Sequence, residues 1–433
     1  MATERIWLDD SPQALDWIGI RILKALAEHG HEAYFVGGFV RDRLAGRAIQ
    51  DIDIATAALP ETVMRIFPHT APTGLKHGTV TVIEDGHPFE VTTFRKESDY
   101  EQFRRPRQVE FITALEEDLR RRDFTINAMA CRSDGTLVDP FGGAADLEAG
   151  RLRCVGRPEE RFREDALRMM RCLRFASEYA LQIEENTWQA LLALRPLLRH
   201  IAMERVRSEL EKMLEGQQPQ RAVRLLAETS ILAYTKIDLT LPPLRWNDSI
   251  EREAYRMMET RDAALRWTVF WLLLPANAAQ AKAAMDRLTL PRKKADRIHR
   301  ILSFGEWLER HAVYDAETER ARPLFLEAAL QFGRTAALDW LRLPWPDAVH
   351  DGLGTAAACW LAELPIDHVQ QLAVSGHELL QLSGRKGGPW LGILLDRLLR
   401  EVVMDGLPNE RGVLLDQAGK LMKRVNEWAG PVD

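Results

Sequence analysis

The sequence has few cysteines and no long apolar run, and both absences narrow the class of protein. Its four cysteines are Cys131, Cys154, Cys172 and Cys359. They lack C-x-x-C spacing, which excludes a zinc ribbon or a disulfide framework. The longest apolar stretch, near 267–274, stops at Pro275, short of the ~20 residues that a membrane helix needs. The start, MATERIWLDDSP, has neither region of a signal peptide, so we expect a cytoplasmic protein without a membrane partner.

The chain also lacks an excess of basic residues. It has 58 Lys and Arg against 64 Asp and Glu, for a formal net charge of −6. A nucleic-acid partner would therefore have to be met by a local basic surface. Because 46% of its 433 residues are hydrophobic, the chain can bury large cores, which excludes a disordered protein. At ~150 residues per domain, we expect about two to four packed units.

Patterns typical of β-strands are confined to the first third of the chain. We expect a helix over 1–32 and strands over 33–38, 51–56, 78–83 and 88–94. Asp85-Gly86, between the last two strands, is typical of a hairpin turn. From about residue 151 the pattern is helical to the C-terminus. We therefore predict an α+β fold, with a small mixed β-sheet head (1–150) and an all-α neck (151–220), body (221–340) and tail (341–433).

Two aspartates share one face of the second expected strand. In DIDIAT, the period of two sends Asp51 and Asp53 to one face and the isoleucines to the other. Paired carboxylates of this kind can hold a hard cation such as Mg²⁺. A solvated aspartate pair on an edge strand would have the same spacing. In the following hairpin, Glu90 lies on the polar face of its strand and could offer a third carboxylate to a catalytic site.

A glycine turn ahead of these carboxylates favours a phosphate site. VGGFVRD (36–42) indicates a strand end, a Gly-Gly turn and a helix start. Backbone amides near Gly38 could approach a phosphate closely. Arg41, one turn into the helix, could bind phosphate bidentately. A Gly-Gly turn alone is more often structural, but turn, arginine and Asp-x-Asp within about 15 residues together predict a site for a triphosphate and a metal.

Four motifs in this order resemble a known family. VGGFVRD followed by DIDIAT resembles the nucleotidyltransferase head of the DNA polymerase beta superfamily. RRDFTINAM (121–129) and EDALRMMRCLRF (164–175) narrow the resemblance to bacterial class II tRNA nucleotidyltransferases, the CCA-adding enzymes, and to the related poly(A) polymerases. The resemblance covers about 34–215. It implies template-independent addition or repair of the 3′-terminal CCA of tRNA from CTP and ATP, with Mg²⁺ and release of pyrophosphate, and a tail that binds tRNA.

Charged residues recur every three positions within 164–175. On a helix, Asp165, Arg168, Arg171 and Arg174 would form one slanted polar stripe. An Asp acceptor beside an Arg donor can pair with the Watson–Crick edge of cytosine or adenine. The resemblance implies this role for Asp165 and Arg168, and phosphate contacts for Arg171 and Arg174. A solvated helix face with ion pairs is the simpler alternative.

The resemblance also assigns roles outside the neck. It implies that Arg122 contacts the nucleotide and that Asp123 and Asn127 lie near the ribose or brace the site; Asp123 could instead cap a helix. The polar segment 95–111 resembles a flexible loop needed to switch from C to A addition. In the tail, the basic turn 385–390 opens an apolar helix and is either an RNA contact or an ordinary loop.

Several alternative functions share some of these features. A poly(A) polymerase has the same head and neck, and a partial-specificity enzyme would add only CC or only A. An RNA-binding protein without catalysis would not need paired metal ligands. An antibiotic nucleotidyltransferase would share the aspartate pair but would not need EDALR. The oligomeric state is also open, with a homodimer as one option.

Overall fold

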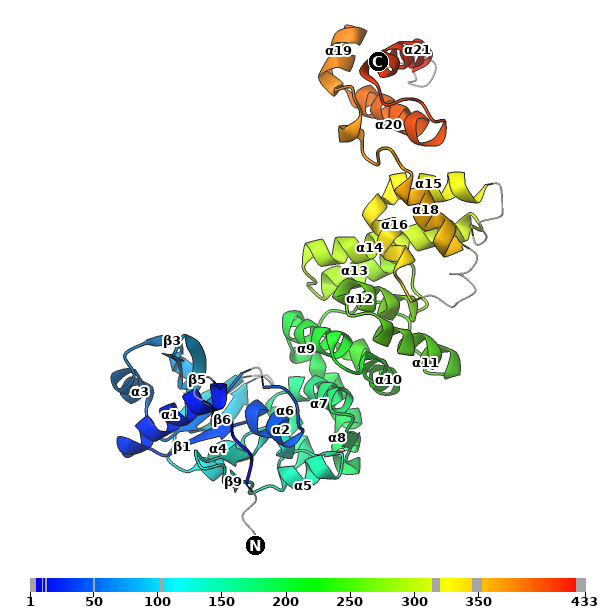
Figure 1. The fold of residues 1–433 in the computed structure, drawn as a ribbon. Helices are drawn as coiled ribbons and strands as arrows, with labels where there is room; N and C mark the ends of the chain where they lie inside the picture. Colours follow the sequence, from blue (N-terminus) through cyan, green and yellow to red (C-terminus); the bar gives the residue numbers. More distant parts are fainter. Residues whose placement is uncertain are drawn as a thin grey trace. The chain divides into compact units, whose positions relative to one another are not determined.

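The computed structural model describes residues 5–9, 11, 14–49, 51–101, 105–313, 320–344 and 353–425. The chain divides into two compact units, Met1–Leu239 and Thr240–Asp433 (Figure 1). The first unit contains the head and the neck helices. The finer division into head, neck, body and tail stays a prediction.

The head is built on a seven-stranded sheet with the order β3-β4-β5-β2-β1-β8-β9. Its strands are β1 (Ala33–Val36), β2 (Asp53–Thr56), β3 (Thr70–Gly74), β4 (Thr79–Glu84), β5 (His87–Thr93), β8 (Ala130–Cys131) and β9 (Leu137–Val138). β2 and β5 pair in parallel, and the other neighbouring strands are antiparallel. The predicted mixed sheet is confirmed. In the predicted hairpin turn, Asp85 and Gly86 have φ values of 50° and 80°, as a two-residue turn of this type requires.

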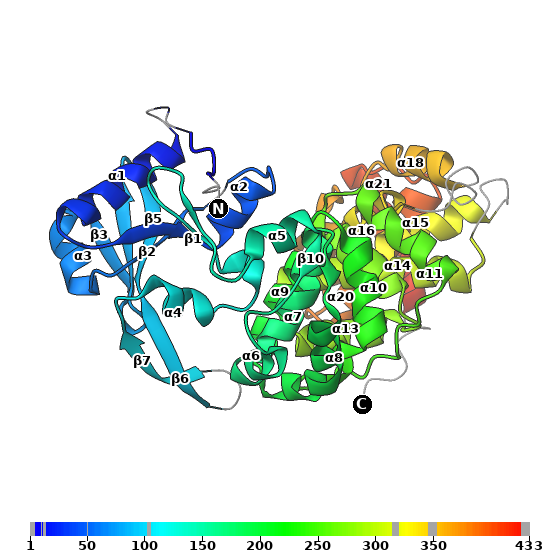
Figure 2. The ribbon, with the colours of Figure 1, turned by 90° about the horizontal axis from the view of Figure 1, so that it is seen from below.

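The two faces of this sheet bury different cores. α1 (Leu15–Glu28) and α3 (Pro60–Ile66) cover one face, over a core that includes Ile54 and Phe89 (Figure 2). Tyr34 and Ala55 belong to a second, smaller core on the other face. Because side chains alternate along a strand, polar residues next to Ile54 and Phe89 lie on this second face.

Two expectations for the head are wrong in part. The helix expected over 1–32 begins only at Leu15, and Arg5 instead forms a β-bridge with Thr136. The segment expected as a loop over 95–111 forms the antiparallel strands β6 (Arg95–Glu101) and β7 (Arg105–Phe111). Pairing satisfies backbone groups that a loop would leave to water, and the polar composition does not prevent it. Residues 102–104 lie outside the described part.

Helices make up most of the remainder of the first unit. They are α2 (Gly38–Leu44), α4 (Leu115–Arg120), α5 (Gly143–Glu148), α6 (Pro158–Glu164), α7 (Leu167–Glu178), α8 (Glu185–Leu194), α9 (Met203–Glu215) and α10 (Pro219–Thr229). The single helix expected over 164–175 is wrong at its start. α6 ends at Glu164 and Asp165 has an extended backbone, with φ −140° and ψ 107°. Asp165 therefore lies in a break between two helices, while the rest of the stripe lies on α7.

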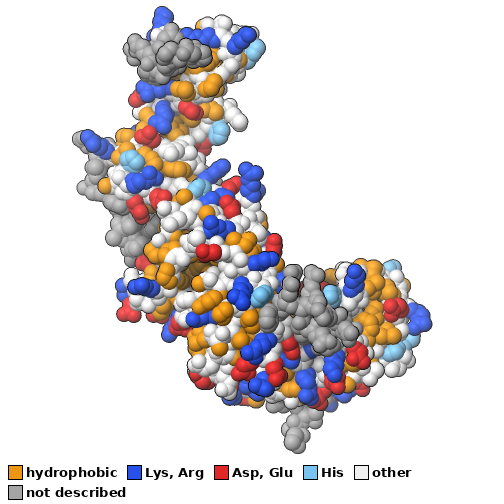
Figure 3. Space-filling view, turned by 180° about the vertical axis from the view of Figure 1, so that it is seen from behind, with side chains coloured by type: hydrophobic (Ala, Val, Ile, Leu, Met, Phe, Trp, Pro, Cys, Tyr) orange, Lys and Arg blue, Asp and Glu red, His pale blue; other side chains and the backbone are white. Residues whose placement is uncertain are grey.

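The described part of the second unit is helical, as predicted. Its α-helices are α11 (Asp248–Tyr255), α12 (Ala263–Leu272), α13 (Ala278–Arg287), α14 (Arg292–Arg310), α15 (Ala321–Phe332), α16 (Arg334–Leu341), α18 (Thr355–Ala362), α19 (Gly376–Ser383), α20 (Pro389–Met404) and α21 (Arg411–Val425). Large aromatic residues such as Trp267, Trp271 and Phe304 are fully buried in it. Across the described residues, every helix is too short or too polar to cross a membrane. Acidic and basic side chains are interspersed on the face in Figure 3.

The turn between β1 and α2 has a backbone that favours glycine. Gly37 has φ +65°, and a Cβ built there would lie 2.9 Å from Arg122 Nη1 and 3.8 Å from Asp53 Oδ2. A Cβ on Gly38, by contrast, would have only Arg41 Nη2 nearby, at 3.7 Å. The first glycine therefore lets the backbone approach Arg122 more closely than any other residue would allow.

Replacing Gly37 with alanine should therefore destabilise the protein in two ways, by straining the backbone and by displacing Arg122. Gly46→Ala is the matched control, because Gly46 also has φ +65° but has open space around its Cβ position. Backbone strain should cost about 1–3 kcal/mol in both variants, and Gly37→Ala should cost more because Arg122 must move. Urea unfolding of the two variants measures the difference. Equal losses would contradict the close approach of the turn to Arg122.

Candidate active site

Three carboxylates lie on one face of β2 and β5. Asp53 is the first residue of β2, and the parallel register places it directly opposite Glu90. Asp51, Asp53 and Glu90 are exposed, whereas Ile52 and Ile54 are buried. The predicted alternation is confirmed, although the strand begins at Asp53 and Asp51 lies two residues before it.

The electrostatics of this cluster favour a cation. The pKa of Asp53 is raised because nearby protein atoms reduce the hydration of its carboxylate and because Glu90 adds a like charge. Within the described residues, no three or more His, Cys, Asp and Glu side chains form a ready-made set of metal ligands. Mg²⁺ commonly binds through only one or two carboxylates, completed by substrate phosphates and water. The donor set therefore fits a cation that arrives with an anionic substrate.

Arg122 lies near these carboxylates and has hydrogen-bonding capacity to spare. Its Nη1 donates to the Asn127 carbonyl at 3.3 Å, and its Nη2 donates to Asp118 at 3.4 Å. Its buried Nε has no hydrogen-bond partner among the described residues. Burial lowers the pKa of Arg122, while Asp118 and Asp53 favour its charged form. A guanidinium with long contacts and an unused donor, beside the Gly37 turn, is suited to an anionic ligand.

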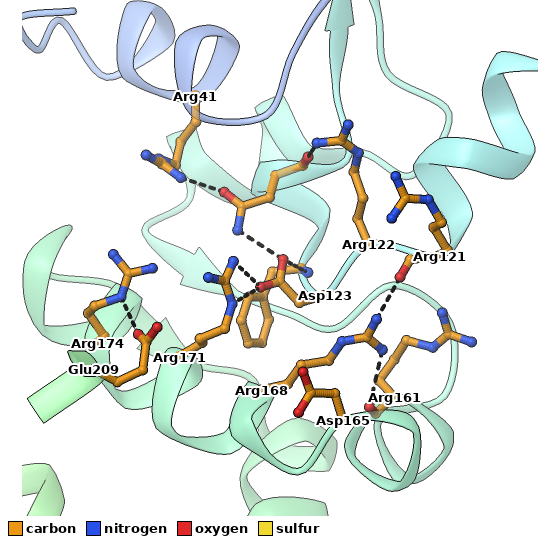
Figure 4. Close-up of polar contacts among 12 residues, drawn as sticks. Arg41, Arg121, Arg122, Asp123, Arg161, Asp165, Arg168, Arg171, Arg174 and Glu209 are labelled. Atoms are coloured by element: carbon orange, nitrogen blue, oxygen red, sulfur yellow. Dashed lines mark hydrogen bonds and ion pairs between the residues drawn. The ribbon is translucent and has the colours of Figure 1, made fainter. Parts of the chain in front are cut away.

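A buried chain of hydrogen bonds joins Arg41 of the head to Arg171 of the neck (Figure 4). Arg41 Nη1 donates to Asn127 Oδ1 at 2.6 Å, and Asn127 Nδ2 donates to Asp123 Oδ1 at 3.0 Å. Arg171 Nε donates to Asp123 Oδ2 at 2.7 Å. Although burial opposes ionisation, Arg171 and Asn127 hold the pKa of Asp123 well below its usual range. Asp123 and Asn127 therefore brace the junction between head and neck.

Arg41 is held by the protein on several sides. It is 8% exposed. Its Nε and Nη2 each donate to a carboxylate oxygen of Asp42 at 3.0 Å. Its guanidinium also lies over the rings of Phe175 and Tyr179, 5.0 and 4.6 Å from their centroids. These contacts and the hydrogen bond to Asn127 give each nitrogen of the Arg41 guanidinium a partner. A phosphate contact by Arg41 would require a change of partners, and it stays a prediction.

The arginines of α7 are paired with carboxylates of other segments. Arg168 is 9% exposed and donates to Glu164. It also donates to the carbonyls of Arg121 and Arg161, at 2.8 and 3.1 Å (Figure 4). Arg174 Nε donates to Glu209 of α9 at 2.7 Å. The predicted stripe is therefore not a solvated helix face. The side chains face neighbouring elements that fix their orientation.

Asp165 is oriented by Arg205, a residue that the sequence analysis does not identify. Arg205 Nη2 donates to Asp165 Oδ2 at 2.7 Å, and the Leu167 N–H donates to Oδ1 at 3.0 Å. Arg205 lies on α9, 40 residues away in the chain. No local pattern connects two such positions. The same holds for Glu209, the partner of Arg174.

Among the described residues, the buried cysteines of the first unit are poor nucleophiles. Burial raises the pKa of Cys131 to about 12, and it also raises the pKa of Cys154 and Cys172. These cysteines are thiols at neutral pH and lack the reactivity of thiolates. What remains is a cluster of carboxylates, an arginine with an unused donor and a close glycine turn. Such a set can position a triphosphate and its cation, and phosphoryl transfer requires little more of a protein.

Models of known protein families match most of the chain. A "Poly A polymerase head domain" model matches residues 33–153. A model for an RNA- and SrmB-binding site of polymerase A matches 180–236, and a model for tRNA nucleotidyltransferase domain 2 matches 258–418. These matches lie in both compact units.

Individual relatives match along nearly the whole chain. The CCA-adding enzyme of Anoxybacillus flavithermus is 40% identical, over 94% of this chain and 98% of its own length. That of Geobacillus stearothermophilus is 41% identical, over 90% and 93%. The crystal structure of the Bacillus stearothermophilus CCA-adding enzyme in complex with CTP is 34% identical, covers 96% of this chain and all of its own, and superimposes with a TM-score of 0.77. The chain therefore belongs to the CCA-adding enzymes, the bacterial class II tRNA nucleotidyltransferases.

Proposed function

We propose that this chain builds and repairs the 3′-terminal CCA of tRNA from CTP and ATP, without a nucleic-acid template and with release of pyrophosphate. The observation that carries the proposal is the register of Asp53 opposite Glu90, beside Arg122 and the Gly37 turn. This register places negative charge, which can bind a metal cation, next to the cationic Arg122, which can bind the triphosphate. Membership of the CCA-adding enzymes supplies the substrates.

Asp51 and Asp53 would hold Mg²⁺, with Glu90 beside them. When bound, the ions would supply positive charge to the attacking 3′-hydroxyl and to the departing pyrophosphate. The carboxylates fit this group because burial and the charge of Glu90 raise the pKa of Asp53, and a bound cation would offset both effects. Mg²⁺ is our proposal, since the same donors also suit other hard divalent ions.

Arg122, with Gly37 and Gly38 behind it, would bind the triphosphate. Its Nε is unused and its Nη1 makes only a long hydrogen bond to the Asn127 carbonyl, so a phosphate could engage these two nitrogens. Arg171 and Arg174 are already paired with carboxylates, so they would contribute long-range positive charge, or would exchange partners when a nucleotide enters.

Asp165 and Arg168 would read the base. Arg205 holds the Asp165 carboxylate and Glu164 holds the Arg168 guanidinium, so each group would meet the base with a preset orientation. Preset donors and acceptors discriminate strongly, because a wrong base leaves them unpaired. The different hydrogen-bonding edges of cytosine and adenine would require a small re-aiming of this pair.

The tail would hold tRNA. A Thermotoga maritima CCA-adding enzyme complexed with tRNA shares the fold, at 23% identity and a TM-score of 0.64. In this chain, the basic turn at the start of α20 is ordered by Trp390 Nε1, which donates to the Lys386 carbonyl at 3.0 Å. Arg385 lies 6.0 Å from the Trp390 ring centroid. The turn thus presents cations at a defined place, which suits an RNA backbone. We expect the enzyme to work in the cytoplasm; the proposal does not require a homodimer.

A primer-extension assay tests this function. The purified chain, Mg²⁺ and labelled tRNA lacking its CCA end are incubated with CTP, with ATP or with both, and an unrelated RNA serves as control. We expect two C residues followed by one A and then a stop, on tRNA only. Long A tracts would instead identify a poly(A) polymerase, and a halt after CC or growth by A alone would identify a partial-specificity enzyme.

Removing the charge of Asp51 or Asp53 should stop nucleotide transfer. We expect Asp51→Asn and Asp53→Asn to lower turnover by at least about a hundredfold, because the lost interaction stabilises charge in the transition state. Binding of tRNA should change little. Asp85→Asn, at the exposed hairpin turn, is the matched control. Turnover as high in either site variant as in the Asp85→Asn control would contradict its assignment as a metal ligand.

Loss of the Arg168 side chain should blur the choice of base. We expect Arg168→Ala to reduce discrimination between CTP and ATP at each step by about tenfold, the effect of one hydrogen bond to a charged group. Single-turnover incorporation of each nucleotide measures it, and Arg163→Ala, an exposed arginine of α6, is the control. Unchanged selectivity in a folded variant would rule out the role in base reading.

A further inference from the structure

One deeply buried carboxylate beside the site has no part in the proposed chemistry. Asp118 lies on α4, between the β6–β7 hairpin and the segment that carries Arg122. Asp118 is only 1% exposed. An aspartate is seldom buried this deeply unless cations or N–H groups compensate its charge. Its partners therefore indicate why it is there.

The two oxygens of Asp118 contact different parts of the head. Oδ1 accepts hydrogen bonds from the backbone N–H of Arg95, the first residue of β6, at 3.2 Å and from Arg121 Nε at 2.9 Å. Oδ2 accepts from Arg122 Nη2 at 3.4 Å. Although burial opposes ionisation, Arg121 and Arg122 hold the pKa of Asp118 below its usual value. The side chain is therefore a carboxylate that links the hairpin base to the candidate triphosphate contact.

Arg122 lies between two carboxylates that attract it. Asp118 and Asp53 both stabilise its charge, and the neighbouring Arg121 destabilises it. The Nη1 contact to the Asn127 carbonyl, at 3.3 Å, is with a neutral group and is long. If the charge of Asp118 were lost, it would no longer balance the repulsion between Arg121 and the Arg122 guanidinium. Asp53 would then draw Arg122 toward the metal-binding carboxylates.

We propose that Asp118 is a positioning residue, which holds Arg122 beside Gly37 for the triphosphate and keeps it from neutralising Asp53. It acts through Arg122 rather than by touching the nucleotide. Because the same carboxylate binds the backbone of Arg95, the start of the hairpin and the orientation of Arg122 depend on one side chain. This inference rests on the proposed function, in which Arg122 contacts the triphosphate.

The test compares Asp118→Asn with Glu116→Gln, which removes an exposed charge from the same helix. We expect Asp118→Asn to raise KM for both CTP and ATP about tenfold, with a smaller change in kcat, and Glu116→Gln to stay within about twofold of the parent. Melting temperatures report folding. If Asp118→Asn does not fold, Asp118→Glu, which keeps the charge but moves the oxygens, should still raise both KM values. Unchanged KM values in a folded Asp118 variant would overturn the proposal.

A double-mutant cycle with Arg122→Ala separates positioning from a merely structural role. If Asp118 acts through Arg122, adding Asp118→Asn to Arg122→Ala should not raise KM further. Additive increases would overturn the proposal. Affinity for CTP, measured by titration calorimetry in the same four proteins, gives the same comparison without RNA. The role of Asp118 can therefore be decided even if the parent chain fails to add CCA to tRNA, an outcome that would overturn the proposed function alone.

Discussion

The candidate site depends on the repulsion between Asp53 and Glu90, which the fold of the head places opposite each other. The parallel register of β2 and β5 places these carboxylates opposite each other, and the buried cores behind both strands prevent a slip that would separate them. Like charges directly opposite each other on neighbouring strands destabilise the pair. Arg122, which lies beside the Gly37 turn, relieves only part of this repulsion. A divalent cation would supply the remainder, so the same strain that raises the pKa of Asp53 also favours its binding.

Most arginines of the site are paired with carboxylates that fix their orientation. Arg171 is tied to Asp123, and Arg174 to Glu209, in surroundings where an unpaired charge would cost about 3–5 kcal/mol. Since guanidinium groups stay charged at any physiological pH, these pairs do not loosen when the pH changes. Arg122 differs because its hydrogen bonds are long and its Nε is unused. Arg122 is therefore the arginine of this set whose hydrogen bonds a substrate could replace with the least loss.

The sequence predicted what depends on local pattern and missed what depends on distant pairing. The alternation of DIDIAT and the Asp-Gly turn each follow from a short-range pattern, and the structure confirms them. The break at Asp165 contains neither glycine nor proline, so helix propensity gives no warning of it. Its carboxylate caps the Leu167 N–H and pairs with Arg205, and that distant partner stabilises the break. The sequence likewise indicates a loop over 95–111, where the structure has a hairpin, because the polarity of side chains does not reveal backbone pairing.

The break at Asp165 also suits the proposed role of its carboxylate in reading the base. A carboxylate in the middle of a helix would lie between the side chains of the preceding and following turns, and the helix alone would set its direction. At the end of α6, the Asp165 backbone is extended, and Arg205 and the start of α7 fix the carboxylate from two directions. Arg168 follows within the first turn of α7, so the acceptor and the donor belong to different segments. Under the proposed base-reading role, a small movement between α6 and α7 would change the relative orientation of this pair, as the recognition of two different bases by one site would require.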